Sequence, residues 1–184
     1  MPDSNGILTI TPTSVVATGT GSSASITTNG AVSFTSIDTL AINGIFSSTY
    51  DDYMVIYRGT ASQETYIQMR LRASGTDNST ASSYAEQRTY FEGTSSGTSR
   101  GTDSMATIHY FTSGLQSGFI GYFYGPYLAQ QTSIRFSNVG NVAGLSVRDW
   151  SWLHSQTTSY DGISLLSYVG RTFSGQIAFY GYRK

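Results

Sequence analysis

The chain has 184 residues, ten of them Lys or Arg and eleven Asp or Glu, which gives a formal net charge of −1. This length predicts one domain, or one domain with an arm, and the missing basic excess argues against nucleic-acid binding. There is no Cys, which excludes disulfides, thiolate metal sites and a Cys nucleophile.

Small hydroxyl residues dominate the composition. Ser and Thr make up 53 residues, Gly 20 and Tyr 14, whereas only 11% of the residues are charged. No segment shows a 3.6-residue apolar period, and most segments alternate apolar and polar residues, as half-buried strands do. The sequence therefore predicts an all-β, antiparallel β-sandwich.

Residues 1–22 are expected to form an extended N-terminal arm or an edge strand, and residues 23–184 the sandwich domain. A short apolar segment ends before a proline, which has no N–H for a central ladder. An arm of this kind is expected to be held by a neighbouring subunit. Its candidate assembly contacts are Ile7, Leu8, Ile10, Pro12 and Val15.

Strand signals follow along the rest of the chain. Residues 24–35 predict a hairpin, with Asn29-Gly30 as a type I′ turn. Residues 53–58 are apolar on both faces, which predicts a central strand. Residues 93–104 are Gly, Ser and Thr rich and are expected to form a loop. Further strands are expected at 37–42, 84–92, 105–111, 119–124, 132–137, 145–153, 163–169 and 176–182.

The clearest strand and turn lie at residues 66–80. Ile67, Met69 and Leu71 share one face, and Arg70 and Arg72 share the other. Successive side chains of a strand point to opposite faces, so we expect the first three residues in the core and the two arginines outside. Residues 74–80 contain Gly, Asp and Asn, which is typical of a turn.

A short motif occurs twice, each time just before a strand. Hydroxyl residues precede Tyr50-Asp51 and also Tyr160-Asp161. We expect a turn in which the Asp side chain accepts bonds from backbone N–H groups. A Ca²⁺ site built from both Asp residues is the alternative, with few acidic ligands nearby to support it.

Groups for catalysis are few. His109 and His154 are expected to be structural, hydrogen-bonded residues. The pattern Gly-x-Ser-x-Gly occurs at 93–97 and 97–101, but it indicates a nucleophile only between a strand and a helix. A glycosidase pair of carboxylates would have to form from Glu64, Glu86, Glu92 or Asp149. We expect no enzymatic activity, no metal and no cofactor.

Surface recognition has more candidates. Arg148, Trp150 and Trp152 share one face of the strand at 145–153, opposite Val147 and Leu153. Trp and Arg dominate interface hot spots and can stack on sugars. Three alternatives are open for this face: a second buried face, a subunit interface, or a glycan site. Arg70 and Arg72 are candidates for pairing across a subunit contact.

Several passages resemble small β-jelly-roll virion proteins of tailed bacteriophages. They are spread over nearly the whole chain, although residues 93–118 and the strand with Trp150 and Trp152 depart from the pattern. The passages are residues 10–15, 47–53, 69–80, 124–130, 157–162 and 175–182.

The resemblance implies a jelly-roll scaffold and a homotrimeric capsid decoration protein in the virion, assembled in the host cytoplasm. It would bind the major capsid protein through the arm. The alternative is a receptor- or glycan-binding module at the tip of a tail or head fibre, contacting a host surface glycan. No partner in a membrane is expected, because no run of 18 apolar residues occurs and the N-terminus lacks the features of a secretory signal.

Overall fold

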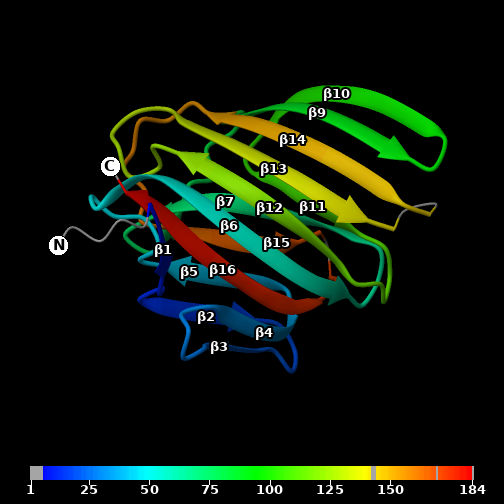
Figure 1. Ribbon diagram of the computed structural model, residues 1–184, viewed down its shortest axis with the longest axis horizontal. Coiled ribbons are helices and arrows are strands. Elements are labelled where there is room, and N and C mark those ends of the chain that lie inside the picture. Colours follow the sequence, from blue (N-terminus) through cyan, green and yellow to red (C-terminus); the bar gives the residue numbers. More distant parts are fainter. Residues whose placement is uncertain (1–5, 142–143, 169, 184) are drawn as a thin grey trace.

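The computed structural model describes residues 6–141, 144–168 and 170–183. Within them the chain forms antiparallel strands arranged in two packed sheets (Figure 1). These residues include no helix that could cross a membrane. The predicted all-β, antiparallel β-sandwich is confirmed, whereas jelly-roll connectivity stays a prediction.

The larger sheet has ten strands. Its long strands, β6, β12, β13 and β16, cross the middle of the molecule, and the β9–β10 hairpin forms one end (Figure 1). β1 pairs beside β16 next to this path. The strand order is β10 (Ser95–Asp103), β9 (Tyr84–Glu92), β14 (Ser146–His154), β13 (Thr132–Gly140), β12 (Ser117–Tyr124), β6 (Tyr50–Ala61), β16 (Phe173–Arg183), β4 (Val32–Ile37) and β3 (Ser23–Ile26), with β1 at Ile7–Ile10.

The smaller sheet has six strands. β7 lies between β11 and β15, and β8 pairs with the end of β7. The order is β11 (Ala106–Phe111), β7 (Thr65–Ala73), β15 (Gly162–Ser167), β5 (Thr39–Asn43) and β2 (Ser14–Thr18), with β8 at Thr76–Asp77.

The core lies between the sheets, and strand alternation fills it. On β7 the predicted inward residues Ile67, Met69 and Leu71 are fully buried, which confirms their face. β6 is central, as predicted, with β12 on one side and β16 on the other. Burial of this many large apolar side chains is the main stabilising term of such a fold. The larger sheet contributes Phe34, Tyr53, Val55, Tyr57, Phe119, Phe123, Phe136, Trp150, Ile177 and Phe179.

The segment predicted as an arm is paired with strands of the same chain. β1 hydrogen-bonds to β16, with Ile7 opposite Tyr182, and β2 forms the outer strand of the smaller sheet beside β5. The edge-strand alternative therefore describes residues 7–18. Pro12 lies between β1 and β2, where no ladder N–H is needed. Residues 1–5 of the predicted arm lie outside the described residues.

Two local predictions were wrong in detail. Residues 95–103 form strand β10 and not a loop, because β10 pairs with all of β9 across a tight turn in which Gly93 has a φ of 55°. The β3–β4 hairpin is present, but its turn is not type I′. That turn needs positive φ at both central residues, and only Gly30, with a φ of 85°, has it.

The second copy of the Tyr-Asp motif forms the expected turn contacts, whereas Tyr50 and Asp51 of the first copy lie within β6. Asp161 Oδ2 accepts a hydrogen bond of 3.0 Å from the backbone N–H of Ser74. The hydroxyl of Tyr160 accepts one of 2.8 Å from the side-chain amide of Asn78. Both contacts fix the β7–β8 turn against the start of β15.

Candidate functional site on the outer face of the larger sheet

The two tryptophans of β14 lie in the core. Trp150 is 0% exposed and Trp152 is 5% exposed. The indole N–H of Trp152 donates to the backbone carbonyl of Thr107 at 3.0 Å. Of the three alternatives for this face, the buried one holds, and neither Trp side chain is available to a subunit or a glycan.

The three candidate arginines all bond within the chain. Arg72 pairs with Asp77 and donates to Ser164 Oγ at 2.7 Å, which joins β7, β8 and β15. Arg70 donates to the carbonyl of Ser104 at 3.4 Å. Arg148 is almost fully buried and forms an ion pair with Glu92. Arg70 and Arg72 lie on the predicted outer face of β7, and their interface role stays a prediction.

Both histidines are buried and hydrogen-bonded. His109 contacts Asn138 and Ser117 through its two ring nitrogens, and His154 Nε2 lies 2.6 Å from the hydroxyl of Tyr160. Burial lowers the pKa of each imidazole to about 4. No group of three metal-ligating side chains forms within the described residues.

The outer face of the larger sheet carries an apolar patch made of Ile56, Phe91, Ile120, Val139 and Val147. Strand register brings these residues together: Phe91 lies opposite Val147, Val147 opposite Val139, and Ile120 opposite Ile56. Phe91 is 62% exposed and Val139 is 57% exposed. A shallow hollow of about 380 Å³ runs between β6, β12, β13 and β14 in this patch. Contiguous exposed apolar surface of this kind marks interaction sites.

A tyrosine group lies at the other end of the same strands. It consists of Tyr122 and Tyr124 on β12 and Tyr180 and Tyr182 on β16. The rings of Tyr122 and Tyr124 are stacked, with centroids 6.4 Å apart and an interplanar angle of 18°. The hydroxyl of Tyr182 lies 3.8 Å from the sulfur of Met54, which holds this ring over β6.

A hollow of about 460 Å³ adjoins Tyr124. Its wall combines the exposed Tyr124 ring and Leu153 with hydrogen-bonding side chains from three strands. The polar members are Glu86, Gln87, Ser133, Arg135 and Ser151. A flat ring beside fixed donors and acceptors is the usual composition of a small-ligand site.

An ion pair lies next to the tyrosine group, toward the apolar patch. Arg135 donates to both carboxylate oxygens of Asp149, at 3.0 and 2.6 Å. Asp149 also accepts from Ser137 Oγ at 3.1 Å. This carboxylate raises the pKa of Arg135, so the guanidinium stays charged at neutral pH.

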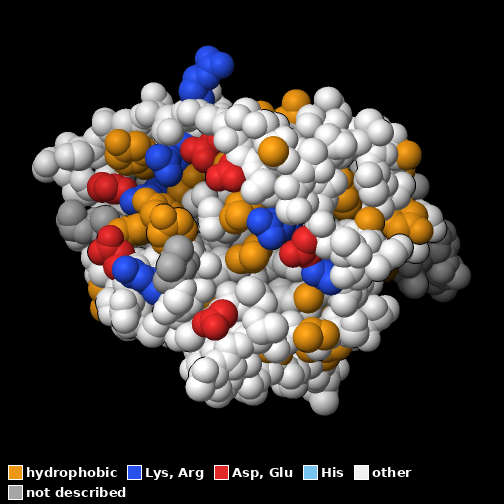
Figure 2. All heavy atoms as spheres, turned by 180° about the vertical axis from the view of Figure 1, so that it is seen from behind, with side chains coloured by type: hydrophobic (Ala, Val, Ile, Leu, Met, Phe, Trp, Pro, Cys, Tyr) orange, Lys and Arg blue, Asp and Glu red, His pale blue; other side chains and the backbone are white. Residues whose placement is uncertain are grey.

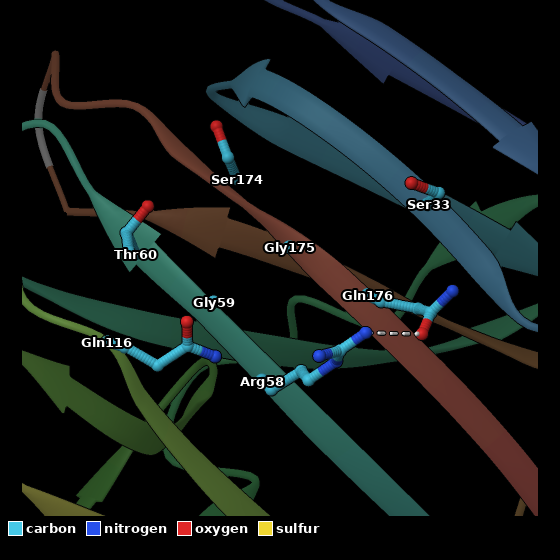
Figure 3. Close-up of a pocket in the computed structure, with 8 residues that line it drawn as sticks. All are labelled: Ser33, Arg58, Gly59, Thr60, Gln116, Ser174, Gly175 and Gln176. Carbon is cyan, nitrogen blue, oxygen red and sulfur yellow. Dashed lines mark hydrogen bonds between the residues drawn. The ribbon is translucent and has the colours of Figure 1, made fainter.

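A polar hollow of about 310 Å³ lies near the far end of the apolar patch, over β4, β6 and β16 (Figure 3). Gly59 and Gly175 leave the backbone bare at its floor, and Arg58 Nη2 lies 3.5 Å from Gln176 Oε1. The larger sheet thus offers a continuous outer face with polar, apolar and aromatic parts.

Most residues of this outer face of the larger sheet could not be predicted from the sequence. The alternation of Tyr122 and Tyr124 with Phe123 was visible, but which side would be exposed was not. Phe91, Val139 and Val147 lie far apart in the chain, and only the strand order β9–β14–β13 brings them together.

No protein-family model matches the chain, and no curated protein matches it. Among solved structures, the chain is similar to a protein of unknown function, SO2946 from Shewanella oneidensis MR-1. The identity is 11% and the TM-score 0.39, over 100% of this chain and 81% of that one. At this level of similarity it carries no functional inference.

Proposed function

We propose that the chain is a non-enzymatic structural protein of a tailed-bacteriophage virion, which assembles as a homotrimer through the apolar patch. The observation that carries the proposal is the row of Phe91, Val147 and Val139, exposed side by side on an uncovered sheet face. Further copies of the chain are the proposed occupants, because the resemblance implies a homotrimer, and a patch at the threefold axis meets the equivalent patches of the other two copies. The virion, assembled in the host cytoplasm, is its proposed location.

The test is the mass of the protein in solution. Light scattering should give about three times the chain mass of 19.9 kDa. Val139→Asp and Val147→Asp should each lower this mass toward one chain while the variant remains folded; the thermal midpoint should fall only by the stability that association contributes. Val16→Asp is the matched control, because Val16 is also exposed but lies on the smaller sheet. A monomeric wild-type protein, or a Val139→Asp variant that keeps its full mass, would contradict assembly through this patch.

Among the described residues of the segment 1–22, fewer side chains are available for capsid attachment than the sequence predicted. β1 and β2 are part of the sandwich, and their exposed large apolar side chains are Ile7 and Val16. Deleting the segment would therefore damage the fold. The double variant Ile7→Ser/Val16→Ser should lose binding to purified phage heads while remaining folded; full saturation of heads by this variant would count against decoration.

The second candidate function is glycan binding at a fibre tip, and the tyrosine group favours it. The stacked Tyr122 and Tyr124 and the adjoining hollow of about 460 Å³ have the composition of a sugar site. Tyr124→Ala should abolish binding to host surface glycans, whereas Tyr168→Ala, which removes an exposed ring elsewhere, should not. Equal binding by both variants would rule out this candidate.

A further inference from the structure

The inner face of the β9–β10 hairpin is only partly covered. The smaller sheet ends at β11, which lies under β14, as the bond from Trp152 to Thr107 shows. Beyond that line β9 is half-buried and β10 is largely exposed. Basic and acidic side chains gather beside hydrophobic ones at the corresponding end of the rear face (Figure 2).

A hollow of about 180 Å³ lies under this hairpin. Three of its lining residues come from β9, one from β14 and one from β7. Arg88, Tyr90, Glu92, Arg148 and Tyr66 line it. These side chains lie on the opposite side of β9 and β14 from the apolar patch, because residues 88, 90 and 92 alternate with Thr89 and Phe91 along the strand.

Two guanidinium groups meet around the same aromatic rings. The Arg148 guanidinium carbon lies 4.3 Å from the Tyr110 ring centre, and those of Arg88 and Arg148 both lie 5.7 Å from that of Trp150. Tyr90 lies 5.7 Å from Arg88 and 5.9 Å from Arg148. Both guanidinium groups therefore belong to one aromatic-walled hollow, where cationic side chains attract anions.

Each of the two arginines has one acidic neighbour, but only one of these carboxylates lines the hollow. Within the lining, Glu92 pairs with Arg148, so two cations face one carboxylate. Arg88 forms a longer ion pair with Glu86, with 3.6 Å between Nε and Oε1 and no hydrogen bond, and Glu86 lies outside the lining. The Nε atoms of Arg88 and Arg148 are buried without a hydrogen-bond partner among the described residues. Unsatisfied buried donors of this kind are costly unless an acceptor is supplied.

We propose that this hollow binds the carboxylate of an acidic sugar ring, such as a hexuronic or sialic acid. Arginine forks match a carboxylate in geometry and charge, and the Tyr66 and Tyr90 side chains offer aromatic contact for the ring that carries it. The Glu92 carboxylate pairs with the Arg148 guanidinium, and it therefore competes with the ligand carboxylate for this group. The site is independent of assembly through the apolar patch.

The test uses glucuronate and N-acetylneuraminate as acid probes, with glucose and inorganic phosphate as neutral and simple-anion probes. NMR titration of the wild-type protein should show binding of at least one acid and none of glucose. Arg88→Gln should weaken this binding at least tenfold. Glu92→Gln should tighten it severalfold, because the competing carboxylate is removed; a purely structural ion pair would not produce that gain.

Arg100→Gln is the matched control, since Arg100 is exposed on β10 and lines none of the hollows described above, and it should bind the acid as the wild type does. Thermal midpoints of all variants verify folding. Phosphate binding as tight as that of the acids, no binding of either acid, or unchanged binding in Arg88→Gln would overturn the proposal. If Val139→Asp loses its oligomers but still binds the acid, the acid-sugar proposal is supported and is independent of the proposed assembly.

Discussion

The indole N–H of Trp152 donates to the backbone carbonyl of Thr107 at 3.0 Å and thereby joins the two sheets. Trp152 belongs to β14 of the larger sheet and Thr107 to β11, the outer strand of the smaller one. Of the alternatives considered for Trp152, the buried face is the one realised, and the side chain links the two sheets inside the sandwich.

Replacing Trp152 by Phe should destabilise the fold. The change removes the donor to Thr107 and leaves a small cavity, at a cost of about 2–4 kcal/mol in the free energy of unfolding. Urea denaturation measures this loss. Leu153→Ala, one residue along on the exposed face, should stay within about 1 kcal/mol. Equal stability of the Trp152→Phe variant and the wild type would show that the link contributes nothing.

Both imidazoles should remain neutral well below their ordinary pKa. Burial lowers the pKa of His109 and His154 to about 4, from 6.5. The unfolded chain then binds more protons than the folded one between these values, so these groups make stability fall as pH drops from about 6.5 toward 4. Their contribution is complete above that window.

NMR measures this directly, because the chain has only two histidines. The ring-proton shifts of both should stay constant from pH 7.5 to 5. A midpoint near 6.5 for either ring would show that it is solvated in the folded protein.

Gly59 should not tolerate a larger residue. A Cβ there would lie 2.1 Å from the carbonyl oxygen of Ser174 and 2.1 Å from the hydroxyl of Tyr57. Gly59→Ala is expected to cost about 1–3 kcal/mol in the free energy of unfolding. Gly101→Ala is the control, since a Cβ there meets nothing within 4 Å. If both variants unfold at the same urea concentration, close packing at Gly59 is not a constraint.

Arg72 should stabilise the β7–β8 turn and not only the surface. Its guanidinium pairs with Asp77 and donates to Asn43 Oδ1 at 3.1 Å. Arg72→Gln should lower the free energy of unfolding by about 2 kcal/mol, because charged hydrogen bonds are lost and Asp77 keeps an uncompensated charge. Arg100→Gln, on the exposed strand β10, should have little effect. A comparable loss in both variants would argue against this role.

Sequence predicted the β-class and the strong strands because their alternation is local. It missed β10, whose Ser, Thr and Gly residues carry no apolar pattern and are held by backbone pairing to β9. On β14 the polarity misleads: Val147 and Leu153 are exposed, while Arg148 and His154 are buried. That inversion depends on partners such as Glu92 and Tyr160, which lie elsewhere in the chain, so no reading of one strand could reveal it. The hollow lined by Arg88 could not be predicted from one strand either, because its lining residues come from β7, β9 and β14.

The central position of β6 has a consequence for how the protein is made. One of its neighbours is β12, and the other is β16, whose residues 173–183 leave the ribosome more than 110 residues after β6. β1 and β4 also pair with β16. Until β16 is synthesised, the edges of these strands that pair with it are exposed, and they can pair instead with neighbouring nascent chains. The larger sheet cannot be completed before β16 is synthesised, and its folding is expected to be slow, as the long separations between its partners imply.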